Sequence, residues 1–205
     1  MVADLQETDI RETTPNEIEK DNLKKIIKQT FPLLFISLIG SLFAGLILGG
    51  MEETLKTIPG LIVVVPAVLD MRGNIYGALG SRLSTGLHQG LIEPKLIYER
   101  NLIVAISAAL FNGGVVSIVL GASAYLTLNI LKIKVISLFE LIAITFLSGI
   151  TSGLILTVIV LISLFIGFKK GIDPDNLVGP VVTVSGDIFS ILILFLVAKL
   201  IIGGI

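Results

Sequence analysis

The stretch PGLIVVVPAVLDMRGNIYGALGSRLST, residues 59–85, combines an apolar run with polar side chains at helical spacing. The polar and small positions form one series: Asp70, Asn74, Gly77, Ser81 and Thr85. Steps of three and four residues place this series on one face of a single helix. Pro66 has no backbone N–H, so the carbonyl of Ile62 must find another partner or a water-filled cavity inside lipid. The stretch predicts a membrane helix with a stripe of oxygen atoms along one side.

The whole chain has the composition of a membrane protein. Hydrophobic residues make up 54% of its 205 residues and charged residues only 15%, whereas a soluble domain carries about 25% charged residues. A membrane span needs roughly 20 apolar residues. Such segments are expected at residues 29–50, 57–86, 101–130, 137–168 and 177–202. We therefore expect an all-α integral membrane protein with five transmembrane helices, a multi-pass protein of the cell membrane.

A polar segment, residues 1–28, precedes the first span. Thr14 followed by Pro15 is typical of a helix start, and apolar residues then recur at helical spacing opposite lysines. This pattern predicts an amphipathic helix at the membrane surface, with a gate or cap over a pore mouth as the alternative. We expect two domains, a cytoplasmic N-terminal segment at 1–28 and a five-span transport unit at 29–205.

The basic residues predict how the spans are oriented. With the N-terminus in the cytoplasm, ten lie on the inner side: Arg11, Lys20, Lys24, Lys25, Lys28, Arg82, Lys95, Arg100, Lys169 and Lys170. Four lie on the outer side: Lys56, Lys132, Lys134 and Lys199. Arg72 falls within the membrane. Cytoplasmic loops carry the excess of Lys and Arg, so the count predicts an N-in, C-out orientation.

A second polar stripe follows the last predicted span. Its members are Asn176, Pro180, Thr183, Asp187 and Ser190, again at steps of three and four residues. Asp187 lies about 15 Å into the span by helical rise, and intramembrane carboxylates are costly and usually functional. We interpret Asp187 and Asp70 as parts of an ion pathway. The alternatives are a neutral, hydrogen-bonded acid at Asp187 and a structural Asp–Arg pair at Asp70.

Asp173 and Asp175 stand at the start of the same span. Asp173 before Pro174 is typical of a helix N-cap, and Asp175 favours the positive end of the helix. The functional alternative is an acidic cytoplasmic vestibule, completed by Asn176, that attracts a hydrated cation.

Small residues at steps of four predict close contacts between helices. One set lies in the first span: Ser37, Ser41, Gly45 and Gly49. Two further sets lie in the third and fourth spans: Gly113, Ser117 and Gly121, then Thr145, Ser148, Gly149, Ser152 and Gly153.

The residue types present restrict the chemistry. The chain has no cysteine and one histidine, His88, so any metal is held by oxygen atoms, which favours hard cations such as Mg²⁺. His88 is expected to be interfacial. No Gly-x-Ser-x-Gly motif or histidine-bearing metal motif is present, which argues against an intramembrane enzyme. The net charge of −1 gives no sign of a nucleic-acid partner.

Two motifs resemble a known family. Residues 59–85, above all Gly73-Asn74 and the sequence from Gly80 to Thr85, are similar to the membrane domain of the MgtE-type magnesium transporters. The Ser-Arg-Leu-Ser-Thr continuation is closer to the related eukaryotic solute carriers. Residues 173–176 with Pro180 and Asp187 resemble the family's second pore motif.

The resemblance implies a transporter and not an enzyme. It implies a homodimer in the lipid bilayer, with a pore at the two-fold axis lined by the second and fifth spans. Asp187 would hold the central Mg²⁺ and Asn74 would line the same pore. The residue spacing adds Asp70 and Thr183, from the two polar stripes, as further oxygen ligands. A Na⁺-coupled Mg²⁺ exchanger or a transporter of another cation uses the same ligand chemistry, and a structural membrane scaffold is the alternative from a different class.

The charge count yields a first testable prediction. A reporter that is active only in the cytoplasm, fused after Ile205, is expected to be inactive because an odd number of spans places this end outside. The measurement is reporter activity in intact cells, with the same reporter fused before Met1 as the positive control. Strong activity at Ile205 would contradict the orientation.

Overall fold

The computed structural model describes residues 15–95 and 99–203, and within this part the chain folds into five long helices. The helices are α1 (Pro15–Thr57), α2 (Leu61–His88), α3 (Arg100–Ile130), α4 (Leu138–Lys169) and α5 (Pro174–Ile202). Each contains a stretch long and apolar enough to cross a membrane. The predicted five-span, all-α architecture is therefore confirmed.

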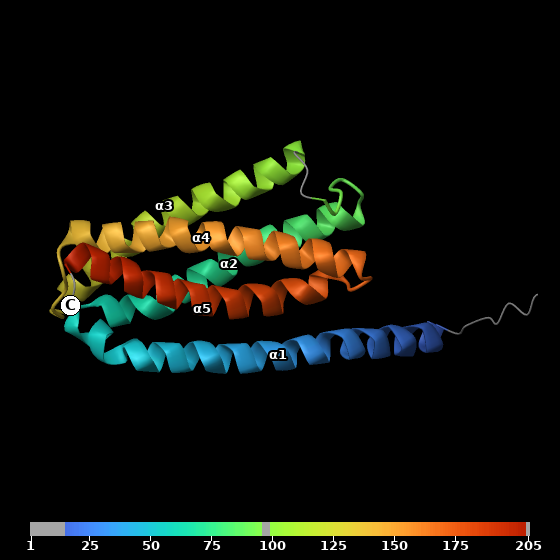
Figure 1. Cartoon of the computed structure of the whole chain (residues 1–205), viewed down its shortest axis with the longest axis horizontal. Helices are drawn as coiled ribbons and strands as arrows, with labels where there is room; N and C mark the ends of the chain where they lie inside the picture. The colour runs from blue at the N-terminus through green and yellow to red at the C-terminus, as the bar shows by residue number, and fades with distance from the viewer. Residues whose placement is uncertain (1–14, 96–98, 204–205) are drawn as a thin grey trace, which may run out of the picture.

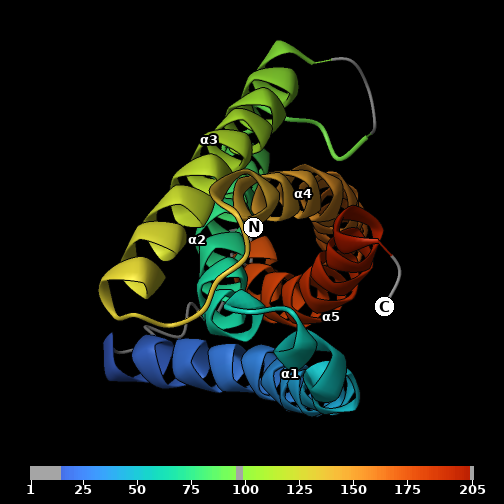
Figure 2. The ribbon, with the colours of Figure 1, turned by 90° about the vertical axis from the view of Figure 1, so that its left-hand side faces the viewer.

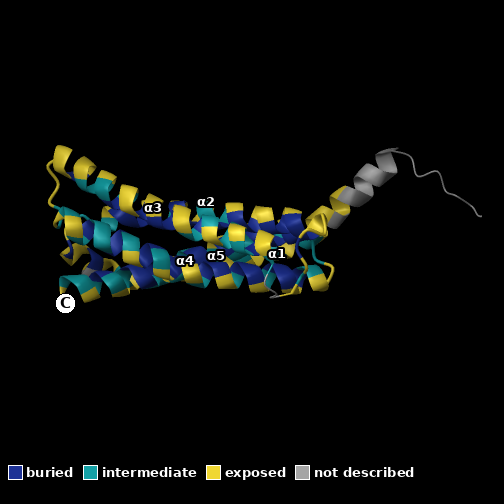
Figure 3. Ribbon diagram, turned by 90° about the horizontal axis from the view of Figure 1, so that it is seen from above, coloured by how far each residue is buried: buried dark blue, intermediate teal, exposed yellow. Residues whose placement is uncertain are grey.

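The chain reverses direction after each helix, which gives an up-and-down bundle (Figure 1). α4 and α5 pack against each other, α3 flanks α4, and α1 lies along α5 (Figure 2). α2 contacts α3, α4 and α5. The outer positions of α1 and α3 are largely exposed (Figure 3). These exposed side chains are mostly large and apolar, as expected of surfaces that face lipid.

The first helix joins two predicted segments. α1 continues without a break through the expected surface helix and the first span, and the apolar stretch within it is Ile26–Glu53. Its start at Pro15 agrees with the helix start read from the sequence, while the predicted cap Thr14 and the residues before it lie outside the described part. Pro32 lies within the helix.

The core consists of two apolar clusters with a polar layer between them. One cluster, near the α2 C-terminus, includes Leu83, Leu164 and Val178. The other, near the α2 N-terminus, includes Val64 and Leu194. The layer between them contains buried polar residues from four helices: Arg72, Ser117, Thr145, Ser148, Ser152, Ser185 and Ser190.

Arg72 lies at the centre of this layer and is fully buried. Its Nη1 donates a 2.9 Å hydrogen bond to the carbonyl oxygen of Gly149 on α4. Tyr76, one turn further along α2, is also fully buried, and its hydroxyl lies against Gly153 and Gly113. Only glycine leaves room for these two large side chains, because a Cβ at Gly153 would overlap the tyrosine hydroxyl.

The predicted small-residue contacts are confirmed between α3 and α4. A Cβ at Gly121 would lie 2.8 Å from the Cα of Ile142 and 2.5 Å from the Oγ1 of Thr145. The prediction for α1 is wrong in its second half. Gly45 and Gly49 are exposed, and a Cβ on either would meet no atom within 4 Å. α1 therefore contacts the bundle through a different set of residues, which includes Gly40 against Val184.

The close approach of α3 and α4 yields a second prediction. Gly121→Ala is expected to destabilise the folded protein by about 1–3 kcal/mol, because the new methyl group meets backbone atoms of α4 that cannot move aside cheaply. Gly45→Ala is the matched control, since alanine is favoured over glycine in a helix by up to about 1 kcal/mol and space is open there. Thermal unfolding of the purified protein in detergent measures both. Equal melting temperatures for the two variants would show that the glycine contact is not required.

Candidate functional site

The polar stripe of α2 is the uncovered side of that helix. Asp70, Asn74, Ser81 and Thr85 are all exposed, and Gly77 is half-buried. The opposite side of α2 is buried in the core and carries Arg72, Tyr76, Leu79 and Leu83 among others. The sequence placed these polar residues on one face correctly, and the structure shows that this face points out of the single chain.

Asp70 and Arg72 do not form an ion pair. The carboxylate of Asp70 accepts a 3.0 Å hydrogen bond from Nδ2 of Asn74, one turn along the same stripe. Arg72 instead points into the bundle toward Gly149. The intrahelical bond aligns the Asn74 side chain with Asp70, so both present oxygen atoms on the exposed face.

Two residues of the α5 polar stripe, Asn176 and Asp187, contact α1, whereas Thr183 is exposed and Ser190 is buried in the core. Asn176 donates through Nδ2 to Oε1 of Gln29 and accepts at Oδ1 from the hydroxyl of Thr30, both at 3.1 Å. Half-buried Asp187 accepts a long 3.5 Å hydrogen bond from the hydroxyl of Ser41. α1 thus supplies three polar partners to the stripe of α5.

This seam between α1 and α5 has a constant register. Thr30 and Asn176 are 146 residues apart in the chain, and so are Ser41 and Asp187. Two parallel helices that keep one offset over three turns present matching rows to each other. The sequence shows the same spacing of eleven residues on both helices, from Thr30 to Ser41 and from Asn176 to Asp187. This spacing does not identify α1 as the neighbour of α5.

The candidate residues of α2 and α5 lie at the same depth. These antiparallel helices touch where a Cβ on Gly80 would lie 2.6 Å from Cγ1 of Val178. Counted from that contact toward the N-terminus of α2 at 1.5 Å per residue, Asn74 lies about 9 Å away, Asp187 about 13.5 Å and Asp70 about 15 Å. The two carboxylates therefore share one level of the bundle.

This level is the middle of α5 and lies about 7 Å from the middle of α2, on the side of the α2 N-terminus. The midpoint of α2 falls between Asn74 and Ile75, and that of α5 at Ile188. Thr183, one turn before Asp187, is exposed at nearly the same depth. Within the described residues, no hydrogen bond joins the α2 stripe to the α5 stripe. The two rows of oxygen atoms therefore lie at similar depth but do not contact each other through hydrogen bonds.

A second group of acidic residues lies at the N-terminal end of α5. Asp173 caps the helix by accepting a 3.0 Å hydrogen bond from the backbone N–H of Asp175, which confirms the predicted N-cap. His88, from the end of α2, places Nε2 3.3 Å from the Asp173 carboxylate. Ligand atoms of His88, Asp173 and Asp175 all lie within 4.8 Å of one another. The sequence predicts His88 to be interfacial and does not reveal this group, because only the folded bundle brings the two helix ends together.

Comparison with known proteins identifies similar chains. Residues 65–197 match the MgtE family, described as divalent cation transporter. This match includes the whole α2 stripe, from Asp70 to Thr85, and the whole α5 stripe, from Asn176 to Ser190. No solved structure matches the chain.

Curated relatives match over nearly the whole chain. Solute carrier family 41 member 2 of Mus musculus is 27% identical over 201 residues, which cover 91% of this chain and 33% of the relative. The Homo sapiens member 2 is 28% identical over 207 residues, covering 94% of this chain and 34% of the relative. Member 3 of Rattus norvegicus is 26% identical over 176 residues, covering 81% and 37%. The chain thus spans about a third of the length of the relatives it matches.

Proposed function

The chain belongs to the MgtE family of divalent cation transporters, and on that premise we propose that it carries Mg²⁺ across the membrane along a polar pathway between two copies of the chain. The observation that carries the proposal is the uncovered polar stripe of α2 at the same mid-bundle depth as Asp187. Polar side chains facing outward at this depth cannot be satisfied by hydrocarbon. They require water, an ion or a partner chain.

The proposed ion site uses the oxygen atoms of four residues: Asp187, Asn74, Asp70 and Thr183. Mg²⁺ prefers six oxygen ligands in octahedral geometry and releases its waters reluctantly. Two carboxylates supply charge, while the amide and hydroxyl groups can accept hydrogen bonds from the water shell. Such a mixture suits a largely hydrated Mg²⁺ that must bind and also leave.

The homodimer follows from the exposure of the stripe. A second copy related by a two-fold axis along the membrane normal would turn both α2 stripes toward each other and away from lipid. Closed two-fold dimers are the commonest oligomers. The pairing would also double the carboxylates at the level of Asp187, so that the cation meets four acidic groups in place of two.

The acidic end of α5 is proposed as the cytoplasmic approach. Asp173 and Asp175 would attract hydrated cations to the mouth. Asn176 lies one turn further in, and its amide is held by Gln29 and Thr30. It therefore combines a position on the pathway with a structural link to α1. This assignment rests on the N-in orientation predicted above.

The ion site yields a third prediction. Asp187→Asn preserves size and an acceptor for Ser41 but removes the charge. It is expected to lower Mg²⁺ flux into liposomes by about tenfold or more, the change produced by losing roughly 1.4 kcal/mol of charge stabilisation. The measurement is Mg²⁺ uptake with a fluorescent indicator, with and without a Na⁺ gradient to separate a channel from a coupled exchanger.

Asp173→Asn is the matched control. Asparagine caps a helix about as well as aspartate, so flux should stay within about twofold of the parent. If Asp187→Asn transports like the parent while Asp173→Asn does not, the selective step lies at the cytoplasmic mouth and the mid-membrane site is wrong.

The homodimer yields a fourth prediction. The chain has no cysteine, so single introduced cysteines report only on contacts between copies. Ser81→Cys, on the α2 stripe, is expected to crosslink two chains on oxidation in membranes. Phe111→Cys, 71% exposed on α3, is the control that should stay monomeric on a denaturing gel. Crosslinking through Phe111 but not Ser81 would place the interface elsewhere.

A further inference from the structure

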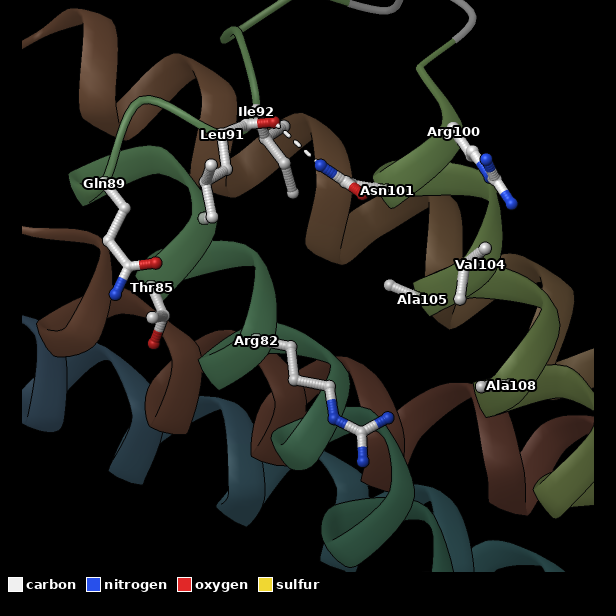
Figure 4. Close-up of a pocket in the computed structure, with 11 residues that line it drawn as sticks. Arg82, Thr85, Gln89, Leu91, Ile92, Arg100, Asn101, Val104, Ala105 and Ala108 are labelled. Carbon is white, nitrogen blue, oxygen red and sulfur yellow. Dashed lines mark hydrogen bonds between the residues drawn. The ribbon is translucent and has the colours of Figure 1, made fainter.

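A cavity of about 360 Å³ lies between the C-terminal end of α2 and the first turns of α3. At this end α3 leans away from the rest of the bundle (Figure 1). The turn after α2, which includes Gln89, Leu91 and Ile92, closes one side of the cavity (Figure 4). Asn101 holds the turn to α3 through a 3.4 Å hydrogen bond from Nδ2 to the carbonyl oxygen of Leu91. The α2–α3 pocket, as we call it, is therefore built by two helices and the link between them.

Two arginines line the α2–α3 pocket. Arg82 extends from α2 and Arg100 from the start of α3 (Figure 4). Both residues are exposed, and neither guanidinium has an ion pair with a carboxylate among the described side chains. Arg82 lies six residues before the end of α2, about 9 Å inside it by helical rise. A positive charge at such a depth in a membrane needs an anion or a route to water.

The acidic residues of the adjoining loop do not neutralise these arginines. Glu93 pairs with Lys95 at 2.9 Å. Hydrogen bonding to Lys95 holds the pKa of the Glu93 carboxyl below its usual value, so Glu93 stays ionised in this pair. Both carboxylate oxygens of Glu99 accept from the backbone N–H of Glu93, at 3.2 and 3.3 Å. The charge available to a ligand in the pocket is therefore positive.

The wall of the pocket along α3 is apolar beyond Asn101, while Thr85 and Gln89 add polar groups on the α2 side. Val104, Ala105 and Ala108 follow Arg100 along α3 toward the middle of the membrane. Positive charge next to a small-residue apolar wall matches a molecule with a phosphate at one end and hydrocarbon at the other. A soluble phosphate would use the arginines alone and leave this wall uncovered.

We propose that the α2–α3 pocket binds an anionic phospholipid, with its phosphate at Arg82 and Arg100 and an acyl chain along Val104, Ala105 and Ala108. Basic pockets between membrane helices on the cytoplasmic side are suited to anionic headgroups. Under the N-in orientation, this pocket opens to the cytoplasmic leaflet, where such lipids are abundant. The pocket shares Thr85 with the α2 stripe, but Arg82, Arg100 and the apolar wall lie outside the four residues of the proposed ion site. The proposal does not depend on Mg²⁺ transport.

The test is native mass spectrometry of the full chain in neutral detergent with dioleoyl phosphatidylglycerol. The double variant Arg82→Gln/Arg100→Gln is expected to weaken the first lipid adduct by about tenfold, the loss typical of a charge-assisted pair of contacts. The matched control is Lys169→Gln/Lys170→Gln, which removes two exposed charges at the same end of the bundle but outside the pocket. It should leave the adduct within about twofold of the parent.

Two further variants separate charge from shape and from misfolding. Arg82→Lys/Arg100→Lys keeps both charges and should restore most of the lipid binding lost in the glutamine variant. Ala108→Phe keeps the arginines but fills the apolar wall, and it should also weaken the adduct. Retention of the lipid by Ala108→Phe would overturn the acyl-chain half of the proposal.

The remaining arms identify the ligand. Phosphatidylcholine should bind weakly, and millimolar inorganic phosphate should fail to displace phosphatidylglycerol. Equal binding of the two lipids, equal weakening by the lysine control, or displacement by inorganic phosphate would each overturn the proposal. If the Arg82→Gln/Arg100→Gln variant loses its dimer and keeps the lipid adduct, a second copy of the chain occupies the pocket and the proposal is wrong.

Discussion

The hydrogen bond from Arg72 to the carbonyl oxygen of Gly149 determines how α2 is rotated in the bundle. A guanidinium in a membrane protein must be surrounded by protein or water, and here it lies inside, where glycines allow α4 to come close. Since Asp70 and Asn74 lie on the other side of the same helix, burying Arg72 turns them outward. The outward polar stripe is thus a consequence of the inward arginine.

The same polar layer divides the molecule. Apolar clusters hold each end of the bundle together, and the middle is built from serine, threonine and glycine around Arg72. Without a hydrophobic driving force between helices in lipid, close packing of small residues and interhelical hydrogen bonds provide the association. The middle of the bundle is therefore polar on its inside as well as along the α2 stripe, and both regions share the depth of Asp187.

The sequence predicts the features that lie within a single helix, and it does not predict the contacts between two helices. Hydrophobic length gives the five spans, and residue spacing gives the two stripes, because both are properties of a single helix. The Asp173 cap is equally local. The partners of Asn176 and Asp187 on α1, the meeting of His88 with Asp173, and the inward direction of Arg72 depend on which helices are neighbours. Spacing alone also misplaced Gly45 and Gly49, since a row of small residues does not say which side of a helix meets the bundle.

The parallel register of α1 and α5 ties two distant levels of the membrane to each other. Thr30 meets Asn176 near the N-terminal end of α5, and Ser41 meets Asp187 at its middle, with the same offset. α1 is one continuous helix across both contacts. A slide of α1 along its axis by a single residue, about 1.5 Å, would bring to each level a neighbouring side chain that points roughly 100° away from the α5 row. Both contacts would then break in the same step. The hydroxyl of Ser41 would leave the Asp187 carboxylate as the hydroxyl of Thr30 leaves the Asn176 amide.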